Sequence, residues 1–241
     1  MKISKIFTPG KTVAIAVAVI IMTLLFVVLP LSLGSIAKNI VMEYSPDAIG
    51  ADVVLNHVYI SALSGKLKAT DLEIGNPKSY GRGFSIKAPS IKATAKPFAV
   101  FRKEIVIDSV VVDNMLINYI KAGKADNIDA LRRNVDKSTS DSWLMKDRKF
   151  VIKSLLLKSP RVIWHPPIIK KSVTFDLPDI HMTNVGEGGA LSSSEVMSLI
   201  ISKMLPPVSR AISLNAEQLK SDTENKARKV ESKVKQFFKR K

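Results

Sequence analysis

The sequence predicts an α+β protein that is mainly β, with an N-terminal transmembrane helix, a one-sided antiparallel sheet and C-terminal amphipathic helices. Three observations predict this class. An uncharged apolar run covers Val13–Leu33. Apolar and polar residues alternate with a period of two through residues 50–190, which is typical of strands with one buried face. The helical period dominates residues 191–241.

The run Val13–Leu33 has the length of a membrane span, because an α-helix needs about 20 apolar residues to cross the hydrocarbon core. Three lysines precede it, whereas the residues after it are mixed in charge. The positive-inside rule therefore places residues 1–12 in the cytoplasm and the residues from about Ser35 onward outside. A cleaved signal peptide is the other interpretation, since Ser35-Ile36-Ala37 offers a loose cleavage site. Either form exports the chain.

Helical character should continue past the span to about Tyr44, where Pro46 closes the helix, and a β domain of residues 50–190 should begin near Gly50. The domain has no cysteine, so packing alone must hold it. The net charge of +16 grows toward the C-terminus. For an exported, tethered chain the nearest polyanion is the headgroup of a phospholipid or the phosphate of lipopolysaccharide. With only 6% aromatic residues, membrane lipid is the expected partner rather than nucleic acid.

A weak internal repeat runs through the predicted β domain, in which a small or acidic residue precedes alternating apolar positions that end on Asn or Ser. Each copy is expected to be one strand that ends in a turn. The four copies are Asp71–Pro77, Ser109–Asn114, Ser154–Pro160 and Asp179–Asn184.

Alternation places one apolar set on a single side of the predicted sheet, because residues two apart share a face. The intervening positions are mixed, which favours an antiparallel sheet with one wet face. We expect this apolar face to contact lipid or a partner. Its members are Leu72, Ile74, Phe84, Ile86, Val110, Val112, Leu155, Leu157, Ile180 and Met182.

Such a face must be covered by a second sheet, a helix or a ligand. Within the β domain the sequence offers only one short helical turn, at Asn127–Arg133. Beyond it, Ser192–Glu195 fits the S-x-x-E capping box and should start a helix, which Pro206-Pro207 should break or restart.

The last part of the chain is basic, with nine basic residues against three acidic ones from Lys220 to Lys241. Apolar residues recur there at helical spacing, so the tail should form a basic amphipathic helix. It resembles an interfacial anchor, although a solvated, partly frayed helix would show the same pattern. The predicted membrane-surface residues are Lys235, Phe237, Phe238, Lys239 and Arg240.

Catalytic chemistry has no local signature in this sequence. The three histidines, His57, His165 and His181, stand apart from one another and from carboxylates at ligand spacing, so no metal site is predicted. There is no G-x-S-x-G motif. We therefore expect no enzymatic activity, no catalytic residue and no cofactor.

Several landmarks together resemble the AsmA-like family of bacterial envelope proteins. They are the N-terminal anchor, the segment Ser64–Pro77, the strand Ile105–Asp113 and the block Leu177–Gly186 that leads into the capped helix. The resemblance implies an inner-membrane anchor, the bulk of the chain in the periplasm, and a groove-like or β-taco sheet associated with phospholipid transport and outer-membrane biogenesis. The chain departs from larger relatives by being short, so it could not bridge two membranes alone.

Two functions remain open on the sequence. In the first, which the sequence favours, the apolar sheet face forms a groove that engages lipid acyl chains or a lipid-transport partner. In the second, the C-terminal helix covers that face as an ordinary core, and the protein is a structural or assembly subunit of an envelope complex. Deleting the helix separates the two, because only the second predicts loss of folding.

Overall fold

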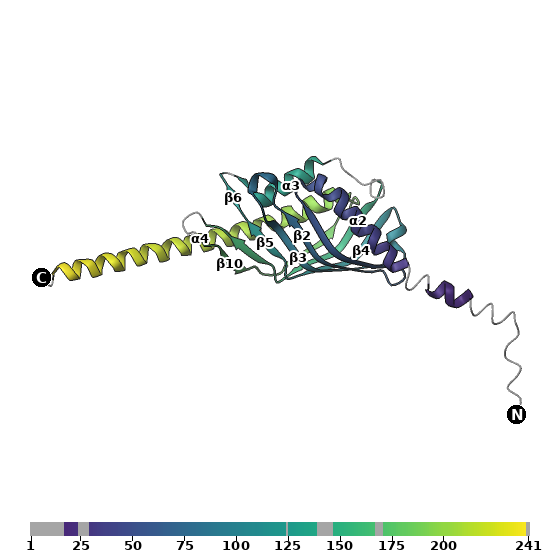
Figure 1. The fold of residues 1–241 in the computed structure, drawn as a ribbon, viewed down its shortest axis with the longest axis horizontal. Coiled ribbons are helices and arrows are strands. Elements are labelled where there is room, and N and C mark those ends of the chain that lie inside the picture. The colour runs from purple at the N-terminus through teal and green to yellow at the C-terminus, as the bar shows by residue number, and fades with distance from the viewer. Residues whose placement is uncertain (1–16, 24–28, 124, 139–146, 167–170, 240–241) are drawn as a thin grey trace, which may run out of the picture.

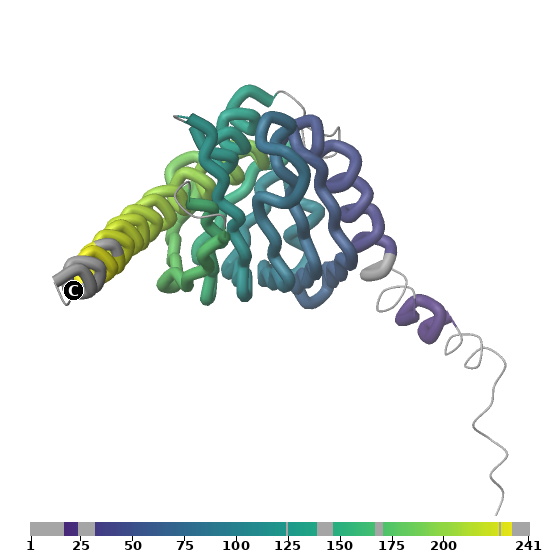
Figure 2. The backbone as a smooth tube through the Cα atoms, turned by 60° about the vertical axis from the view of Figure 1, so that its left-hand side comes forward, coloured from purple at the N-terminus to yellow at the C-terminus, as the bar shows by residue number. Residues whose placement is uncertain are grey.

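A computed structural model describes residues 17–23, 29–123, 125–138, 147–166 and 171–239. The fold is α+β and mostly sheet, as the sequence predicts. One large sheet curls into a half-barrel, and helices pack against it (Figures 1 and 2). The last helix leaves the body as a long rod (Figure 1).

The large sheet contains nine strands, and a separate two-stranded ribbon precedes the middle helix. The strands of the large sheet are β1 (Val53–Ser61), β2 (Lys66–Gly75), β3 (Phe84–Ala95), β4 (Glu104–Asp113), β5 (Leu116–Tyr119), β8 (Lys149–Lys158), β9 (Arg161–Trp164), β10 (Val173–Asp176) and β11 (Ile180–Val185). The ribbon is β6 (Lys121–Ala122) with β7 (Ala125–Asp126), and the helices are α2 (Leu29–Ile49), α3 (Asn127–Lys137) and α4 (Ser193–Lys239). Short 3₁₀ turns cover Lys78–Tyr80 and Ala99–Phe101.

Three pairs of strands in the sheet behave as single strands with a break. β3 pairs with β4 along one half and with β5 along the other. In the same way, β8 pairs with β4 and β9 pairs with β5. On the other side of these strands, β11 pairs with β8 and β10 pairs with β9. The contacts of β4 with β8 and of β5 with β9 are parallel, so the prediction of a wholly antiparallel sheet is wrong. The reason is the chain path, since the connection through α3 returns β8 beside β4 in the same direction.

The breaks lie at one level across the sheet and form a row, here called the kink row: Asp71, Pro89, Asn114, Ser159 and Pro178. The strand ladders skip these positions. Three of the five have a positive φ, between 48° and 54°, and the other two are prolines that lack an N–H donor. Asp179 closes the row near β11, where its carboxylate accepts a hydrogen bond of 2.7 Å from the backbone amide of Ser159.

At the kink row, the side chains that face inward switch between even-numbered and odd-numbered positions of each strand. In the β4–β5 strand the buried residue Val112 is followed by Met115, and in β8–β9 Leu157 is followed by Pro160. A residue in the left-handed conformation within a strand has this effect, because it turns the next side chain to the opposite face. The predicted repeats are therefore correctly located but misread. Ser109–Asn114 and Ser154–Pro160 end at a bend inside a longer strand, and Asp71–Pro77 and Asp179–Asn184 begin at one.

The edge of the sheet at β1 is covered by α2. The two pack so closely that a Cβ on Gly34 would lie 2.0 Å from the carbonyl oxygen of Val58. Lys38 Nζ donates a 2.8 Å hydrogen bond to the carbonyl oxygen of Asn56. α2 runs through Pro46 to Ile49, so the predicted stop at the proline is wrong. The helix ends at Gly50, which has a φ of +68° and donates to the carbonyl oxygen of Pro46.

The predicted capping box of α4 is confirmed. Ser192 N–H donates to Glu195 Oε2 at 2.7 Å, and Glu195 N–H donates back to Ser192 Oγ at 3.3 Å. Pro206 and Pro207 lie inside the helix, which is 47 residues long in all, so the predicted break is wrong. Packing of the apolar face on both sides of the prolines offsets the hydrogen bonds that they remove.

Candidate functional site

The candidate site is the concave face of the sheet, which carries the apolar residues predicted from the sequence. Six of the ten predicted residues are buried and belong to the main hydrophobic core: Ile74, Ile86, Val112, Leu155, Leu157 and Met182. Leu72, Val110 and Ile180 are half-buried and pack against that core. The kink row divides them, because Leu72, Ile74 and Ile86 lie on one side of it and the β4, β8 and β11 residues on the other.

Phe84 is placed differently from the other predicted face residues. Its ring lies 4.4 Å from the Nζ of Lys87, which forms a 2.9 Å ion pair with Glu73. A bulge between Ile74 and Gly75 shifts the register at the start of β3. The neighbouring residue Ser85 takes the buried position instead. Phe84 therefore packs with the charged pair, which simple alternation could not anticipate.

The protein's own helices cover the concave face. α3 contributes Ile128, Leu131 and Val135 to the same core as the sheet residues, and α4 contributes Ile201, Met204 and Val208. Met204 and Leu157 are each only 1% exposed. α3 is a full helix of 11 residues rather than the single predicted turn. The sequence prediction therefore underestimated the helical cover.

A buried polar cluster fixes the N-terminus of α3 to the sheet. The side-chain amide of Asn127 donates to Asn76 Oδ1 at 3.2 Å, to Ser85 Oγ at 3.0 Å and to the carbonyl oxygen of Asn118 at 2.7 Å. Its own Oδ1 accepts from the backbone amide of Ile120 at 2.9 Å. Buried polar groups cost free energy unless they are hydrogen-bonded, and among the described residues only the side-chain nitrogen of Asn76 in this cluster lacks a partner. The cluster therefore specifies where α3 enters the core.

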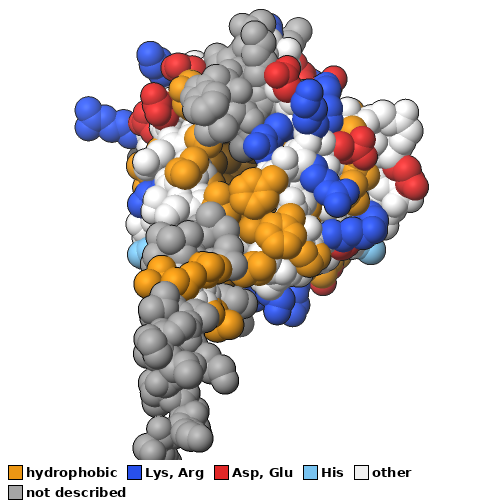
Figure 3. Space-filling model, turned by 90° about the vertical axis from the view of Figure 1, so that its right-hand side faces the viewer, with side chains coloured by type: hydrophobic (Ala, Val, Ile, Leu, Met, Phe, Trp, Pro, Cys, Tyr) orange, Lys and Arg blue, Asp and Glu red, His pale blue; other side chains and the backbone are white. Residues whose placement is uncertain are grey.

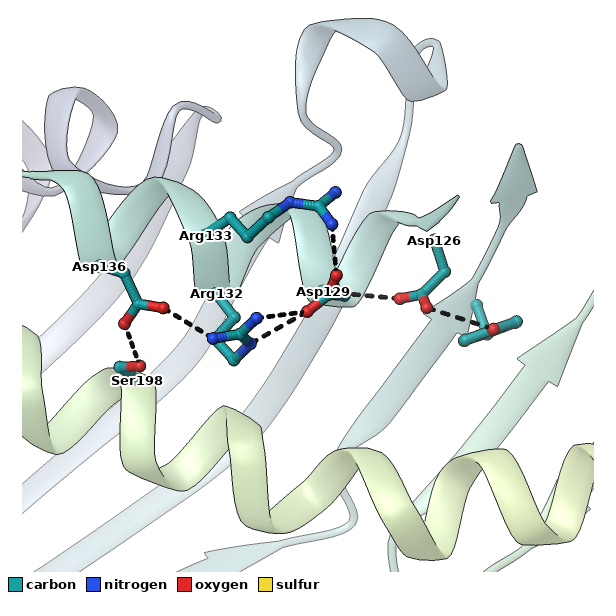
Figure 4. Close-up of polar contacts among 7 residues, drawn as sticks. Asp126, Asp129, Arg132, Arg133, Asp136 and Ser198 are labelled. Carbon is teal, nitrogen blue, oxygen red and sulfur yellow. Dashed lines mark hydrogen bonds and ion pairs between the residues drawn. The ribbon is translucent and has the colours of Figure 1, made fainter. Parts of the chain in front are cut away.

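Charged side chains on the outer side of α3 connect it to α4 (Figure 4). Asp129 binds Arg132 at 2.9 Å and Arg133 at 2.5 Å. Arg132 also binds Asp136 at 2.7 Å, and the hydroxyl of Ser198 on α4 donates to Asp136. Partly exposed pairs of this kind contribute only about 0.3–0.5 kcal/mol each. The apolar stripe, rather than this network, therefore holds α4 in place.

Two ionisable groups near the helix starts have shifted pKa values. Burial, the charge of Asp126 and a 3.3 Å hydrogen bond to it raise the pKa of Tyr119 to about 12. The hydrogen bonds that Glu195 accepts from the backbone and side chain of Ser192 lower the pKa of the Glu195 carboxyl. Both shifts follow from structural roles, because Tyr119 contacts the N-cap residue of α3, Asp126, and Glu195 caps α4.

A cleft of about 800 Å³ opens between the C-terminal end of α2, the loop after β2 and α3. Its lining includes Asp47, Lys78, Tyr80, Arg133 and Lys137. This mixed-charge lining is unlike the apolar wall that acyl chains need. Within the part of the chain that the structure describes, no three His, Cys, Asp or Glu side chains group as metal ligands.

The predicted tail and membrane span are only partly covered by the structure. The backbone of α4 is helical to Lys239, but the side chains of Lys235, Phe237, Phe238 and Lys239, and the whole of Arg240, lie outside the described residues. The same holds for much of Val13–Leu33, of which residues 17–23 and 29–33 are described as helical. Among the described residues, no helix combines the length and apolarity needed to span a bilayer.

No family model, curated protein or solved structure matches the chain.

The features that sequence reasoning missed are the cover by α3 and the Asn127 cluster. The signal for the first was present, because Ile128, Leu131 and Val135 fall at helical spacing. The cluster had no signal, because its three side chains, those of Asn76, Ser85 and Asn127, come from separate parts of the chain.

Proposed function

We propose that this chain is a single-pass inner-membrane protein of the bacterial envelope, with its bulk in the periplasm, that acts as a structural or assembly subunit. Its resemblance to the AsmA-like family and the apolar run Val13–Leu33 support the location. The burial of the concave face under α3 and α4 supports the role. The sheet serves as the protein's own core, and its outer surfaces meet the partner.

The observation that best supports this proposal is that α3 and the first part of α4 share one buried core with the concave face of the sheet. Leu157 on β8 and Met204 and Val208 on α4 are almost wholly buried in one cluster. Protein cores pack as densely as organic crystals. An acyl chain could therefore enter this space only by displacing α4. Where Met204 and Val208 pack in the same cluster as Leu157, the described residues leave no room for an acyl chain.

Two surfaces are available to an envelope partner. The outer part of α4 extends beyond the sheet, and every side chain described from Lys220 to Ser232 is exposed (Figure 1). In the described chain, β10 pairs only with β9 and β11 only with β8, so these strands form an open edge. Helix docking and strand addition are established modes of recognition for such surfaces.

A second candidate function keeps the lipid groove and treats α4 as a removable cover. It is favoured by how α4 is attached. The helix follows β11 after the connection of residues 186–192, and its outer part extends beyond the sheet (Figure 1). If α4 swung away, the face from Leu72 to Met182 would become an apolar groove.

A disulfide lock separates the two candidates, and the absence of cysteine makes the chain suited to it. The side chains of Ser198 on α4 and Asp136 on α3 touch, so S198C with D136C should form a bond that holds the helix down. Each single-cysteine variant is a control. The full-length chain would be purified in detergent, and its lipids would be measured by mass spectrometry with and without reductant.

For the assembly role, the locked and reduced proteins should carry the same lipids and fold equally well. A several-fold loss of bound lipid on locking would instead establish the removable cover. Truncation after Leu191 gives an independent test. The assembly role predicts that the truncated chain fails to fold, because the buried α4 residues Ile201, Met204 and Val208 and the cover that α4 gives the sheet are gone, whereas a folded truncated chain that binds lipid would contradict it.

A further inference from the structure

The loop between β3 and β4 presents two aromatic side chains to solvent. Phe98 is 48% exposed and Phe101 is 55% exposed. They lie in residues 96–103, Lys-Pro-Phe-Ala-Val-Phe-Arg-Lys, in which all three charges are positive. Single exposed apolar residues are common, but two Phe rings on one short loop with three cations around them form an amphipathic unit.

The loop is firmly built, so the exposure of the rings does not come from fraying. Phe98 N–H donates to the carbonyl oxygen of Ala62 at 2.7 Å, and Phe101 N–H donates to the carbonyl oxygen of Phe98 at 3.1 Å. Ala99, between them, is buried. Arg148 donates to the carbonyl oxygen of Val100. The backbone therefore holds both rings outward.

Phe98 also has a conformation that its residue type disfavours. Its φ is +59° and its ψ is +11°, in the left-handed region. Glycine or asparagine adopts this region far more easily than a bulky residue. Folding alone would be served better by either of them. The phenylalanine therefore points to a use for its ring outside the core.

Cationic side chains surround this apolar patch. Lys96, Arg102 and Lys103 are all exposed. In the view of this end of the molecule, hydrophobic side chains gather at the centre with Lys and Arg beside them (Figure 3). Apolar rings with basic neighbours match the boundary between anionic headgroups and acyl chains, where the rings are buried and the cations meet phosphate.

The patch lies at the end of the body where α2 begins. α2 runs antiparallel to β1, with Gly34 against Val58 and Lys38 against Asn56. The first turn of α2 therefore lies toward the end of β1, where Ala62 binds the Phe98 loop. In Figure 1 the start of α2 lies at this end of the body, on the right of the view. The exposed apolar residues of 17–23 precede α2 in the chain.

We propose that Phe98 and Phe101, with Lys96, Arg102 and Lys103, insert into the surface of the bilayer that holds the N-terminal segment. This inference rests on the proposed membrane anchor and deepens it. The loop is a second contact beside the anchor, and together they stand the half-barrel end-on to an anionic membrane. Without the loop contact, the body could rotate about α2. With that contact, the outer part of α4 is held in a defined direction.

The test uses depth-dependent fluorescence quenching in the full-length chain. Single cysteines at F98C or F101C would carry an environment-sensitive fluorophore, and the protein would be reconstituted into vesicles of phosphatidylethanolamine and phosphatidylglycerol that contain brominated lipid. V54C is the matched control. Val54 is 51% exposed and lies seven residues from the end of β1, roughly 23 Å away along the strand.

We expect brominated lipid to quench the probes at positions 98 and 101 at least about twofold more than the probe at 54, because interfacial side chains lie about 5–10 Å into the headgroup and acyl boundary. Replacing phosphatidylglycerol by phosphatidylcholine, or combining K96E, R102E and K103E, should reduce that quenching. Circular dichroism of each variant establishes that it is folded.

Equal, weak quenching at all three positions in protein that floats with the vesicles would overturn the loop contact and leave the anchor intact. Failure of the unmodified chain to float with vesicles would overturn the anchor, and the loop contact with it. Strong quenching at position 54 as well would show that the body lies flat on the membrane, which also contradicts the end-on arrangement.

Discussion

Replacing Met204 by alanine tests whether α4 is part of the core. Met204 is 1% exposed and packs in the main cluster. The substitution removes three heavy atoms, and at about 0.8 kcal/mol for each buried CH₂-sized group the lost transfer free energy is about 2.4 kcal/mol. The residual cavity adds to this, so the free energy of unfolding should fall by about 2.5–4 kcal/mol.

The matched control lies on the same helix. Leu214 is 61% exposed, so Leu214→Ala should change the free energy of unfolding by less than about 0.5 kcal/mol. Urea titration of the full-length chain in a non-ionic detergent, followed by far-ultraviolet circular dichroism, measures both. The reasoning is refuted if Met204→Ala costs no more than Leu214→Ala, because α4 would then not be packed on the sheet.

Three further predictions concern polar groups. Asn127→Ala should cost about 2–4 kcal/mol in urea unfolding, because buried hydrogen-bond partners lose their contact; a cost below about 1 kcal/mol would contradict the cluster. Since the pKa of Tyr119 is raised to about 12, the free energy of unfolding should fall as pH rises from about 10 to 12. Tyr119→Phe should weaken that dependence and remove the latest-titrating phenolate absorbance, while Tyr80, whose pKa burial also raises, retains a smaller part of it. Ser192→Ala should cost about 1 kcal/mol, and NMR titration should show the pKa of Glu195 rising only part of the way to its ordinary value, because the backbone amide of residue 192 still donates to it; a stability cost below about 0.3 kcal/mol would contradict the capping contact.

Much of the fold was predictable because it depends on contacts between residues close in sequence. The capping box of α4 involves only Ser192 and Glu195, and it is found where the motif places it. The apolar positions of β4 and β8, such as Val112 and Leu157, are buried as alternation predicts. The left-handed bends at Asn114 and Ser159 were visible only as a repeat, because Asn and Ser are also usual in ordinary turns.

The helix ends were less predictable where tertiary packing outweighs propensity. Pro46 and Pro206 each remove a helical hydrogen bond, and local rules therefore stop the helix at both. In the structure, α2 and α4 continue through them. Ile49 after the first proline and Val208 after the second are buried in the core, and this burial offsets the local cost.

The sequence by itself determined which segments are strands and helices and which of their sides is apolar, because backbone propensity, capping and alternation act over a few residues. Only the tertiary structure decided what meets each apolar side. An apolar stripe must be buried, but it does not specify its partner. The kink row, the parallel pairing of β4 with β8, and the placement of α4 against Leu157 all depend on contacts between distant residues. The same contacts bring the Phe98 loop to the end of the body where α2 begins.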